Sequence, residues 1–243
     1  MPNWVQNIVK VKGPVKDVDR LLEQVKGESD FDFNKISPMP KTLDMVAGGR
    51  DQESVIYYLS DRLTRSDTAI VCDRKCQVII KEMNMFSSVS SALNRLKMMI
   101  ENQSEQDLND LYETGKQYYE NYVRYGHTSW YGWNIHNWGT KWNASEVEIS
   151  VNTETKTTKD ITIFFQTAWS MPEPIFIKLA TMFPTLMFYG EWADEDIGNN
   201  CGFWGADSGN INFTSEETVE FACNVWGYDP DEYLSDDEED EEE

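Results

Sequence analysis

Hydrophobic and polar positions alternate with a period of two along residues 3–13, and this alternation predicts a β-strand. The valines of this segment share one face, and the more polar residues share the other. After Pro14, residues 15–25 carry apolar side chains at helical spacing, and Gly27 can end that helix. The chain therefore opens with a strand followed at once by an amphipathic helix. Residues 31–36 form a short alternating segment, which ends where Pro38 and Pro40 exclude regular pairing.

Residues 41–124 have a different, mainly helical pattern. Apolar side chains recur every three or four positions over residues 55–63, over 89–100 and again after Ser104. The short β-branched runs 69–71 and 77–80 indicate a small hairpin between the first two helices. Because elements of another kind stand on both sides, we interpret this region as an insertion into the core domain.

Alternation returns beyond the insertion. Residues 146–151 and 160–167 read as two strands, and the Thr-rich turn between them predicts an antiparallel hairpin. A helix follows, with Pro172 and Pro174 near its start and Pro184 after its end. The remaining predictions are a strand over 186–192, edge strands over 201–204 and 210–213, and a helix over 216–226.

Without the insertion, the order of elements is strand, helix, strand, strand, helix, strand. This order is that of the ferredoxin-like fold, an α+β fold in which a split β-α-β antiparallel sheet is packed by two helices. The predicted organisation has four parts: a ferredoxin-like core in 1–40 and 125–213, a mainly helical insertion in 41–124, a C-terminal helix in 214–228 and a disordered acidic tail in 229–243.

Charge is distributed unevenly along the chain. The 243 residues contain 21 Lys and Arg against 43 Asp and Glu, a formal net charge of −22. Residues 179–243 contain 19 of the acids and neither Lys nor Arg, so the first 178 residues are close to neutral. This acidity argues against direct, non-specific binding of nucleic acid or of an acidic membrane surface.

The acids in folded sequence give the first candidate site. Glu191, Asp194, Glu195, Asp196 and Asp207 stand around the last predicted strands. Carboxylates can hold Mg²⁺ or Ca²⁺, but these lack the alternating ligand order of a calcium loop, and we predict no metal. A solvated loop is the simplest reading. The alternative that we carry forward is an acidic interaction surface for a partner protein with a basic surface.

The second candidate is the aromatic segment 125–143. It contains Trp130, Trp133, Trp138 and Trp142, and Lys141 adds a positive charge. Such residues can stack bases on a sheet face, although the basic-aromatic strand signature of RNA-recognition modules is absent. We favour a structural role, in which these side chains are buried against the insertion.

Metal and catalytic constellations are weak. Cys72 and Cys76 have a loose spacing for zinc ligands, and His127 and His136 lie farther apart than finger histidines do. No nucleophile elbow, phosphate-binding glycine loop or metalloprotease motif accompanies them. We therefore expect no cofactor and no enzymatic activity.

Several strings of residues carry a resemblance to a known family. They are Met1-Pro-Asn-Trp-Val-Gln-Asn7, Ile36-Ser-Pro-Met-Pro40, Trp138-Gly-Thr-Lys-Trp-Asn143, Thr167-Ala-Trp-Ser-Met-Pro172 and Trp192-Ala-Asp-Glu-Asp-Ile-Gly198. With these strings the chain resembles the YubB-type ferredoxin-like domain proteins of phages and plasmids, a family described as being of unknown function. The resemblance implies a fold and a mobile-element setting, and it supplies no catalytic residues.

The N-terminus lacks the basic and apolar regions of a signal peptide, and no apolar run is long enough to span a membrane. We expect a protein of the host-cell cytoplasm. The predicted function is that of a non-enzymatic phage or plasmid accessory protein, which binds a host nucleic-acid-binding or defence protein through its acidic surface, inhibiting it or mimicking nucleic acid. The alternative is a single-stranded nucleic-acid-binding module that uses the tryptophans on the sheet.

Overall fold

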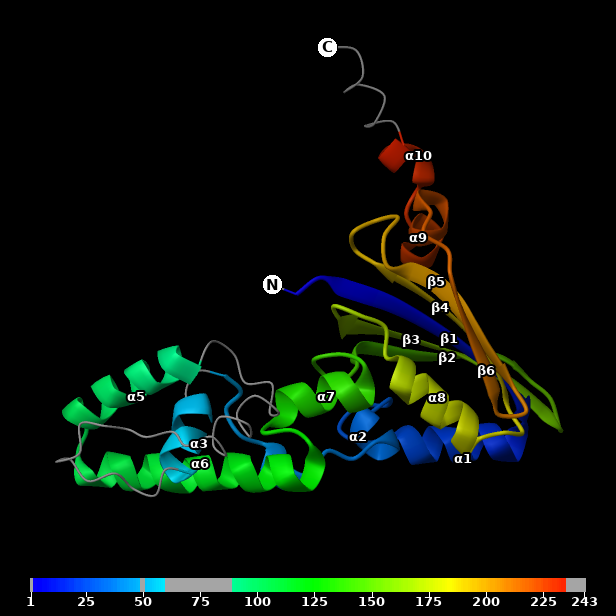
Figure 1. Cartoon of the computed structure of the whole chain (residues 1–243). Coiled ribbons are helices and arrows are strands. Elements are labelled where there is room, and N and C mark those ends of the chain that lie inside the picture. Colours follow the sequence, from blue (N-terminus) through cyan, green and yellow to red (C-terminus); the bar gives the residue numbers. More distant parts are fainter. Residues whose placement is uncertain (1, 49–50, 60–88, 235–243) are drawn as a thin grey trace, which may run out of the picture. The chain divides into compact units, whose positions relative to one another are not determined.

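The computed structural model describes residues 2–48, 51–59 and 89–234 (Figure 1). The chain divides into two compact units, one formed by Met1–Pro38 with Asn134–Glu243 and the other by Met39–Trp133. Among the helices of the described residues, none is long and apolar enough to cross a membrane.

The first unit is built on a six-stranded antiparallel sheet with the strand order β2-β3-β1-β4-β5-β6. The strands are β1 (Trp4–Pro14), β2 (Ser145–Glu154), β3 (Thr158–Ala168), β4 (Met187–Asp194), β5 (Cys201–Asp207) and β6 (Asn210–Ser215). Its helices are α1 (Val15–Val25), α2 (Phe33–Ile36), α7 (Trp130–Trp138), which begins in the other unit, α8 (Glu173–Met182), α9 (Val219–Trp226) and α10 (Pro230–Leu234).

The order β1-α1-β2-β3-α8-β4 along the chain, with β1 paired between β3 and β4, confirms the ferredoxin-like fold predicted from the sequence. The predicted edge strands extend this sheet as an added hairpin, so that β6 and not β4 forms the far edge.

Aromatic packing dominates the sheet face covered by α1 and α8. The Trp204 indole is fully buried and stacks on Phe176 of α8 with 4.3 Å between ring centroids. Gly190 makes this possible, because a Cβ at that position would lie 2.0 Å from the Trp204 Nε1 atom. The valines of β1 belong to the same face, as their spacing predicted, and Val5, Val9 and Val11 are buried.

The opposite face is covered in part by α9, whose buried Ala222 and Val225 pack with Ala193 and Cys201. Farther along the sheet, this face stays open and carries a polar group from β1 and β4. There, the Tyr189 hydroxyl donates to Glu191 Oε1 at 3.1 Å, and Lys10 Nζ lies 3.9 Å from the same carboxylate. Burial and the Glu191 charge both raise the pKa of Tyr189.

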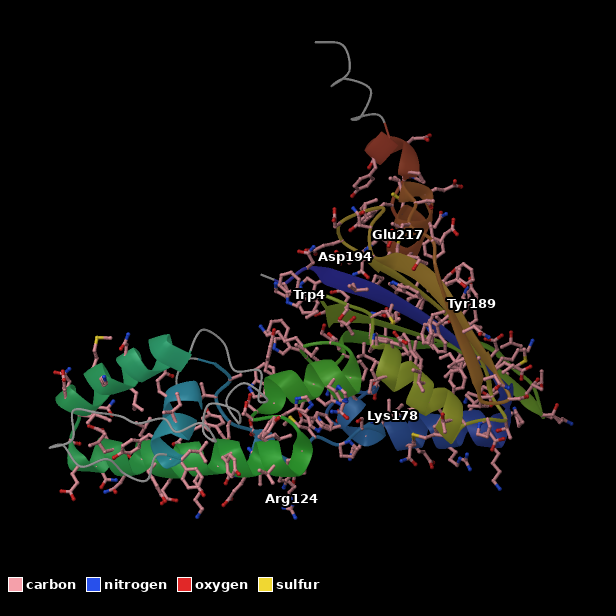
Figure 2. The ribbon with its side chains drawn as sticks, in the orientation of Figure 1. Trp4, Arg124, Lys178, Tyr189, Asp194 and Glu217 are labelled. Carbon is pink, nitrogen blue, oxygen red and sulfur yellow. The ribbon has the colours of Figure 1, made fainter. Side chains whose placement is uncertain are left out.

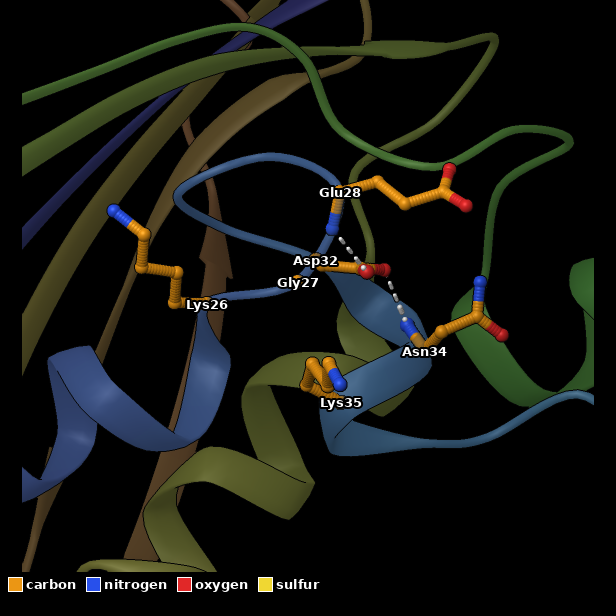
Figure 3. A pocket seen from close by; sticks show the side chains of 6 residues that line it. All are labelled: Lys26, Gly27, Glu28, Asp32, Asn34 and Lys35. Carbon is orange, nitrogen blue, oxygen red and sulfur yellow. Dashed lines mark hydrogen bonds between the residues drawn. The ribbon is translucent and has the colours of Figure 1, made fainter.

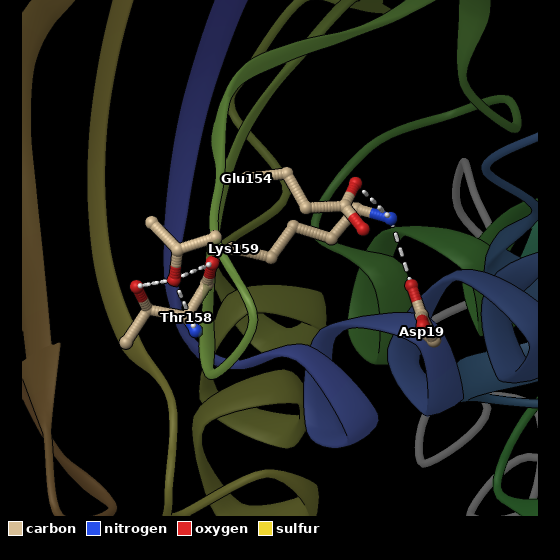
Figure 4. Close-up of polar contacts among 5 residues, drawn as sticks. Asp19, Glu154, Thr158 and Lys159 are labelled. Carbon is tan, nitrogen blue, oxygen red and sulfur yellow. Dashed lines mark hydrogen bonds and ion pairs between the residues drawn. The ribbon is translucent and has the colours of Figure 1, made fainter.

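An ion-paired lysine joins α1 to the β2–β3 hairpin (Figure 4). Lys159 Nζ lies 2.8 Å from Asp19 Oδ1 of α1 and 3.4 Å from Glu154 Oε2 of β2. The hydrogen bond from Lys159 to Asp19 is the main cause that raises the pKa of Lys159 above its ordinary value.

The second unit holds the described part of the helical insertion: the 3-10 helix η1 (Lys41–Leu43), α3 (Asp51–Leu59), α5 (Val89–Asn102) and α6 (Glu105–Tyr125). Ser104 caps α6 in a reciprocal capping box with Asp107, which confirms the start predicted for this helix. Gly115 lets α6 approach α3, because a Cβ there would lie 1.9 Å from the Ser54 carbonyl oxygen. The predicted hairpin over 69–71 and 77–80 lies outside the described residues, as do Cys72 and Cys76.

The segment 31–36, which is short and alternating in the sequence, ends in the short helix α2, whose N-cap Asp32 accepts from the Asn34 backbone N–H. One prediction differs from the structure. Disorder was expected from residue 229 onward, but Pro230–Leu234 forms α10, where Tyr233 stacks on Tyr228. The rest of the predicted tail, 235–243, lies outside the described residues.

Candidate interaction surface

The tryptophans of segment 125–143 are divided between the two units. Trp130 is half-buried and Trp133 is buried in the helical unit, whereas Trp138 is buried in the sheet unit, where its Nε1 donates to the Ser37 carbonyl oxygen. The Trp138 ring also packs edge-on against Phe33, on the helix-covered side of the sheet. The alternative with a row of tryptophans on an open sheet is therefore wrong for Trp133 and Trp138.

Trp142 has a different environment. Its side chain is 38 % exposed, lies 6.1 Å from the Trp4 ring centroid, and has Lys141 Nζ 4.5 Å above its own centroid. Trp169 follows β3 directly and is 52 % exposed. Its backbone N–H donates to the Asn3 carbonyl oxygen, which keeps it beside the start of β1.

The predicted acids do not form one surface. Asp194 is buried at the end of β4, and Glu191 contacts the Lys10 and Tyr189 side chains on the open sheet face. Asp207 is exposed at the opposite end of β5, roughly 20 Å from Cys201 at the rise of an extended strand. Only Glu195 and Asp196 are exposed next to each other, in the loop that follows β4.

Asp194 is a structural residue of that loop. Its Oδ1 accepts from Asn3 Nδ2 at 3.2 Å and from the Asp196 backbone N–H at 3.0 Å, and its Oδ2 accepts from Asn200 Nδ2 at 2.9 Å. The Asp194 backbone carbonyl accepts from Trp226 Nε1 at 3.0 Å. The Asp194 carboxylate thereby joins the segment before β1 to the loop after β4, and its backbone carbonyl joins the end of β4 to α9. No local pattern in the sequence predicts that this residue is buried.

The exposed indoles stand on this scaffold. Glu195 N–H donates to the Trp4 carbonyl oxygen at 2.9 Å, and Asn200 Nδ2 reaches the Trp169 carbonyl oxygen at 3.3 Å. The loop before β2 is fixed to the end of β3, because Thr140 Oγ1 donates to the Ala168 carbonyl oxygen at 2.7 Å. We call the side chains grouped here the Trp4 surface: Trp4, Trp142, Trp169, Glu195 and Asp196. Four of the five strings that carry the family resemblance meet at it.

Trp169 has a backbone φ of 73°, in the left-handed region. For a bulky residue this conformation is rare and costs on the order of 1–3 kcal/mol, and such outliers cluster at functional sites. The hydrogen bonds from Trp169 N–H to Asn3 and from Asn200 to the Trp169 carbonyl hold it in place. Sequence reasoning missed Trp4 and Trp169 as site residues, because only tertiary structure places Trp4 beside Trp142 and Trp169 beside the start of β1.

More carboxylates border the Trp4 surface. Gly198, in the loop after β4, packs on Val219, the first residue of α9. This contact places the loop beside Glu216 and Glu217, which precede α9, and Glu220 in its first turn. We call the exposed acids of these two segments the acidic group: Glu195, Asp196, Glu216, Glu217 and Glu220. In Figure 2, Trp4, Asp194 and Glu217 lie toward the same end of the sheet.

Both described cysteines are buried in the sheet unit, and the two histidines belong to different units. Cys201 and Cys223 are buried free thiols, and burial raises the pKa of both. His127 belongs to the helical unit, and His136 to the sheet unit. Within residues 2–48, 51–59 and 89–234, no group of three or more His, Cys, Asp or Glu side chains is placed to hold a metal ion.

A polar hollow lies between α1 and α2 (Figure 3). Its central carboxylate, Asp32, accepts from the backbone N–H groups of Glu28 and Asn34 and from Asn143 Nδ2. Asp32 therefore stabilises the turn before α2, and its oxygens are already occupied by these donors.

Comparison with known proteins gives two results for this fold. Residues 137–243, which contain β2 to β6, α8 and α9, match the family model of the ferredoxin-like domain in Api92-like protein. The crystal structure of protein Api92 from Yersinia pseudotuberculosis matches with 9 % sequence identity and a TM-score of 0.43, over 89 % of this chain and 99 % of that chain. Curated proteins give no match. Residues 137–243 are thus similar to the ferredoxin-like domain of Api92-like proteins.

Proposed function

We propose that this protein acts by binding a partner protein with a basic surface, and that it contacts this partner through the Trp4 surface and the acidic group. The observation that carries the proposal is the combination found at one end of the sheet: the exposed indoles of Trp142 and Trp169, a neighbouring loop held by the hydrogen bonds of Asp194, and a group of exposed carboxylates.

Each part of this combination has a recognised role in protein binding. Tryptophan is enriched among the residues that contribute most to interfaces, because it buries a large area and loses little conformational entropy. The hydrogen bonds to Asn3, Asp196 and Asn200 fix the scaffold before binding, and preorganisation lowers the free-energy cost of association.

The carboxylates supply steering. Residues 179–243 contain no Lys or Arg that could neutralise them, whereas the first 178 residues are close to neutral. The five members of the acidic group carry charge of one sign, and they would attract a partner of the opposite sign. Complementary charge mainly raises the association rate and selects the partner.

In our proposal the chain performs no chemistry of its own and serves as an accessory protein of a phage or plasmid, the setting implied by the YubB-type resemblance. Its partner would be a nucleic-acid-binding or defence protein of the host, whose basic groove would receive the acidic group in place of phosphates. Burial raises the pKa of the Cys201 and Cys223 thiols, and this disfavours nucleophilic chemistry at these two cysteines.

The test is a quantitative binding comparison. A partner is isolated with the tagged full chain, purified, and titrated calorimetrically against three forms of the protein at about 50 mM and about 500 mM salt. The forms are the natural chain, a variant of the acidic group, and a control with the same charge change on exposed acids of the helical unit. The acidic-group variant is E195Q/D196N/E216Q/E217Q, and the control is E101Q/D110N/E113Q/E120Q.

We expect the acidic-group variant to bind at least roughly tenfold more weakly at low salt, and this loss should shrink at high salt. The control should bind like the natural chain. Equal affinities of the two variants at low salt would overturn the proposal. So would tight binding of single-stranded oligonucleotides with quenching of tryptophan fluorescence, because the chain would then be a nucleic-acid binder.

A further inference from the structure

Three aromatic rings form a stack at the C-terminal end of α9. The ring centroids of Trp226 and Tyr228 are 5.8 Å apart with an interplanar angle of 12°, and those of Tyr228 and Tyr233 are 5.9 Å apart at 18°. We call Trp226, Tyr228 and Tyr233 the aromatic ladder. It continues from the Asp194 scaffold, since Trp226 Nε1 donates to the Asp194 carbonyl oxygen.

The ladder is held at its base by the end of α9. Gly227 adopts a φ of 75°, the left-handed conformation that ends a helix, and its N–H donates to the Cys223 carbonyl oxygen. The Tyr228 N–H bonds to the same oxygen at 2.8 Å. This cap reverses the chain and positions the Tyr228 ring on Trp226, so the ladder does not depend on a flexible linker.

The outer rings are open to solvent. Tyr228 is 44 % exposed and Tyr233 is 41 % exposed. These rings are therefore not part of a hydrophobic core, where aromatic side chains are buried. The Tyr228 and Tyr233 rings are nearly parallel, with centroids 5.9 Å apart, and are in offset contact. A flat group between them would need a ring separation of twice the stacking distance of about 3.5 Å, so none fits. A ligand can therefore lie only on the exposed ring faces and edges.

The charge around the ladder is negative. Asp229 and Asp231 are exposed beside the two tyrosines. An aromatic face in a field of carboxylates attracts cations, and among protein side chains the guanidinium group is the best match. It stacks flat on a ring and can present a bidentate hydrogen-bond pair to a carboxylate.

We propose that the aromatic ladder binds an arginine side chain of the partner protein, with the guanidinium stacked on Tyr228 or Tyr233 and hydrogen-bonded to the Asp231 carboxylate. The inference rests on the proposed function and names the residue type that the basic partner presents. It also separates two contributions: the acidic group attracts the partner, and the aromatic ladder selects arginine over lysine. An ammonium group has the same charge but cannot stack.

The test uses two fluorescent probes of equal charge and length, an arginine-rich and a lysine-rich octapeptide, titrated with the full chain by fluorescence anisotropy. The ladder variants are Tyr228→Leu with Tyr233→Leu, which keeps apolar volume and removes the ring faces, and Tyr228→Phe with Tyr233→Phe, which keeps the rings. Both positions are exposed, and circular dichroism and thermal unfolding of each variant verify that the fold is intact.

We expect the natural chain to bind the arginine probe roughly five- to tenfold more tightly than the lysine probe. The leucine variant should lose this preference, and the phenylalanine variant should keep it. Equal affinity of the natural chain for the two probes, or an unchanged preference in the leucine variant, would overturn the ladder proposal. The proposed function would survive that result if the acidic-group variant still weakened binding of the purified partner.

Discussion

The sharpest prediction concerns the burial of Asp194. In the sequence this residue belongs to the acidic run 194–196, which is typical of a solvent-exposed loop. Three donors converge on its carboxylate, namely Asn3 Nδ2, Asn200 Nδ2 and the Asp196 backbone N–H. Replacement by alanine removes an acceptor from all three. A hydrogen bond to a charged group contributes about 1.5–3 kcal/mol, and a buried donor left unpaired costs about 1–3 kcal/mol.

The expected loss is smaller than the sum of these figures. Asn3 and Asn200 are only partly buried, so water can replace the carboxylate at both amides, and the backbone N–H has the least freedom to find another partner. We therefore expect Asp194→Ala to lower the free energy of unfolding by roughly 2–4 kcal/mol. Its exposed neighbour provides the control, since Glu195→Gln should change stability by less than about 0.5 kcal/mol.

Urea unfolding followed by tryptophan fluorescence measures both variants. The midpoint should fall for Asp194→Ala with an unchanged slope, because a local scaffold is lost and the unfolded state is the same. If Asp194→Ala and Glu195→Gln had equal midpoints, Asp194 would be a solvated surface acid. The scaffold proposed for the Trp4 surface would then not exist.

Two further predictions concern the sheet unit. Gly190→Ala should destabilise the protein by about 1–3 kcal/mol in the same unfolding assay, because the new Cβ would lie 2.0 Å from Trp204 Nε1; unchanged stability would mean that the indole can shift without cost. Lys159→Gln should cost about 1 kcal/mol at pH 8 through the lost pairs with Asp19 and Glu154. Because folding raises the pKa of Lys159, this contribution is complete below the ordinary value of 10.5 and disappears as the pH rises through the folded-state pKa. The two chains should therefore converge in stability once the pH exceeds that raised pKa. A difference that persisted there would assign the effect to packing of the lysine stem.

The core fold was predictable because its signals are local. Alternation in β1 follows directly from one buried face, and the Ser104 capping box lies within four residues. The segment 31–36 lacks such a clear local signal, because Phe31 and Phe33 fit a period of two whereas Phe33 and Ile36 fit one helical turn. Its outcome depends on the Asp32 cap and on Asn143, which accepts from the Phe33 N–H more than a hundred residues away.

The candidate site was predictable only in part, because it depends on distant pairs. The acidic run 194–196 is visible in the sequence. The burial of Asp194 is not, because its hydrogen bond from Asn3 joins residues that are 191 positions apart. Exposure of Trp169 has no local signal, and Trp138 and Trp142 look alike in sequence although one is buried and the other is half exposed. Tyr228 and Tyr233 were assigned to the helix end and the tail, and only the cap at Gly227 brings their rings together.

Amide hydrogen exchange of the full chain, with and without the purified partner, tests the central claim most directly. The account predicts that partner binding slows exchange around the Trp4 surface and the acidic group, in residues 138–143, 168–170, 194–200 and 216–233. Exchange in the described part of the helical insertion should stay unchanged. Protection confined to that insertion, or to the open sheet face around Tyr189, would contradict the account.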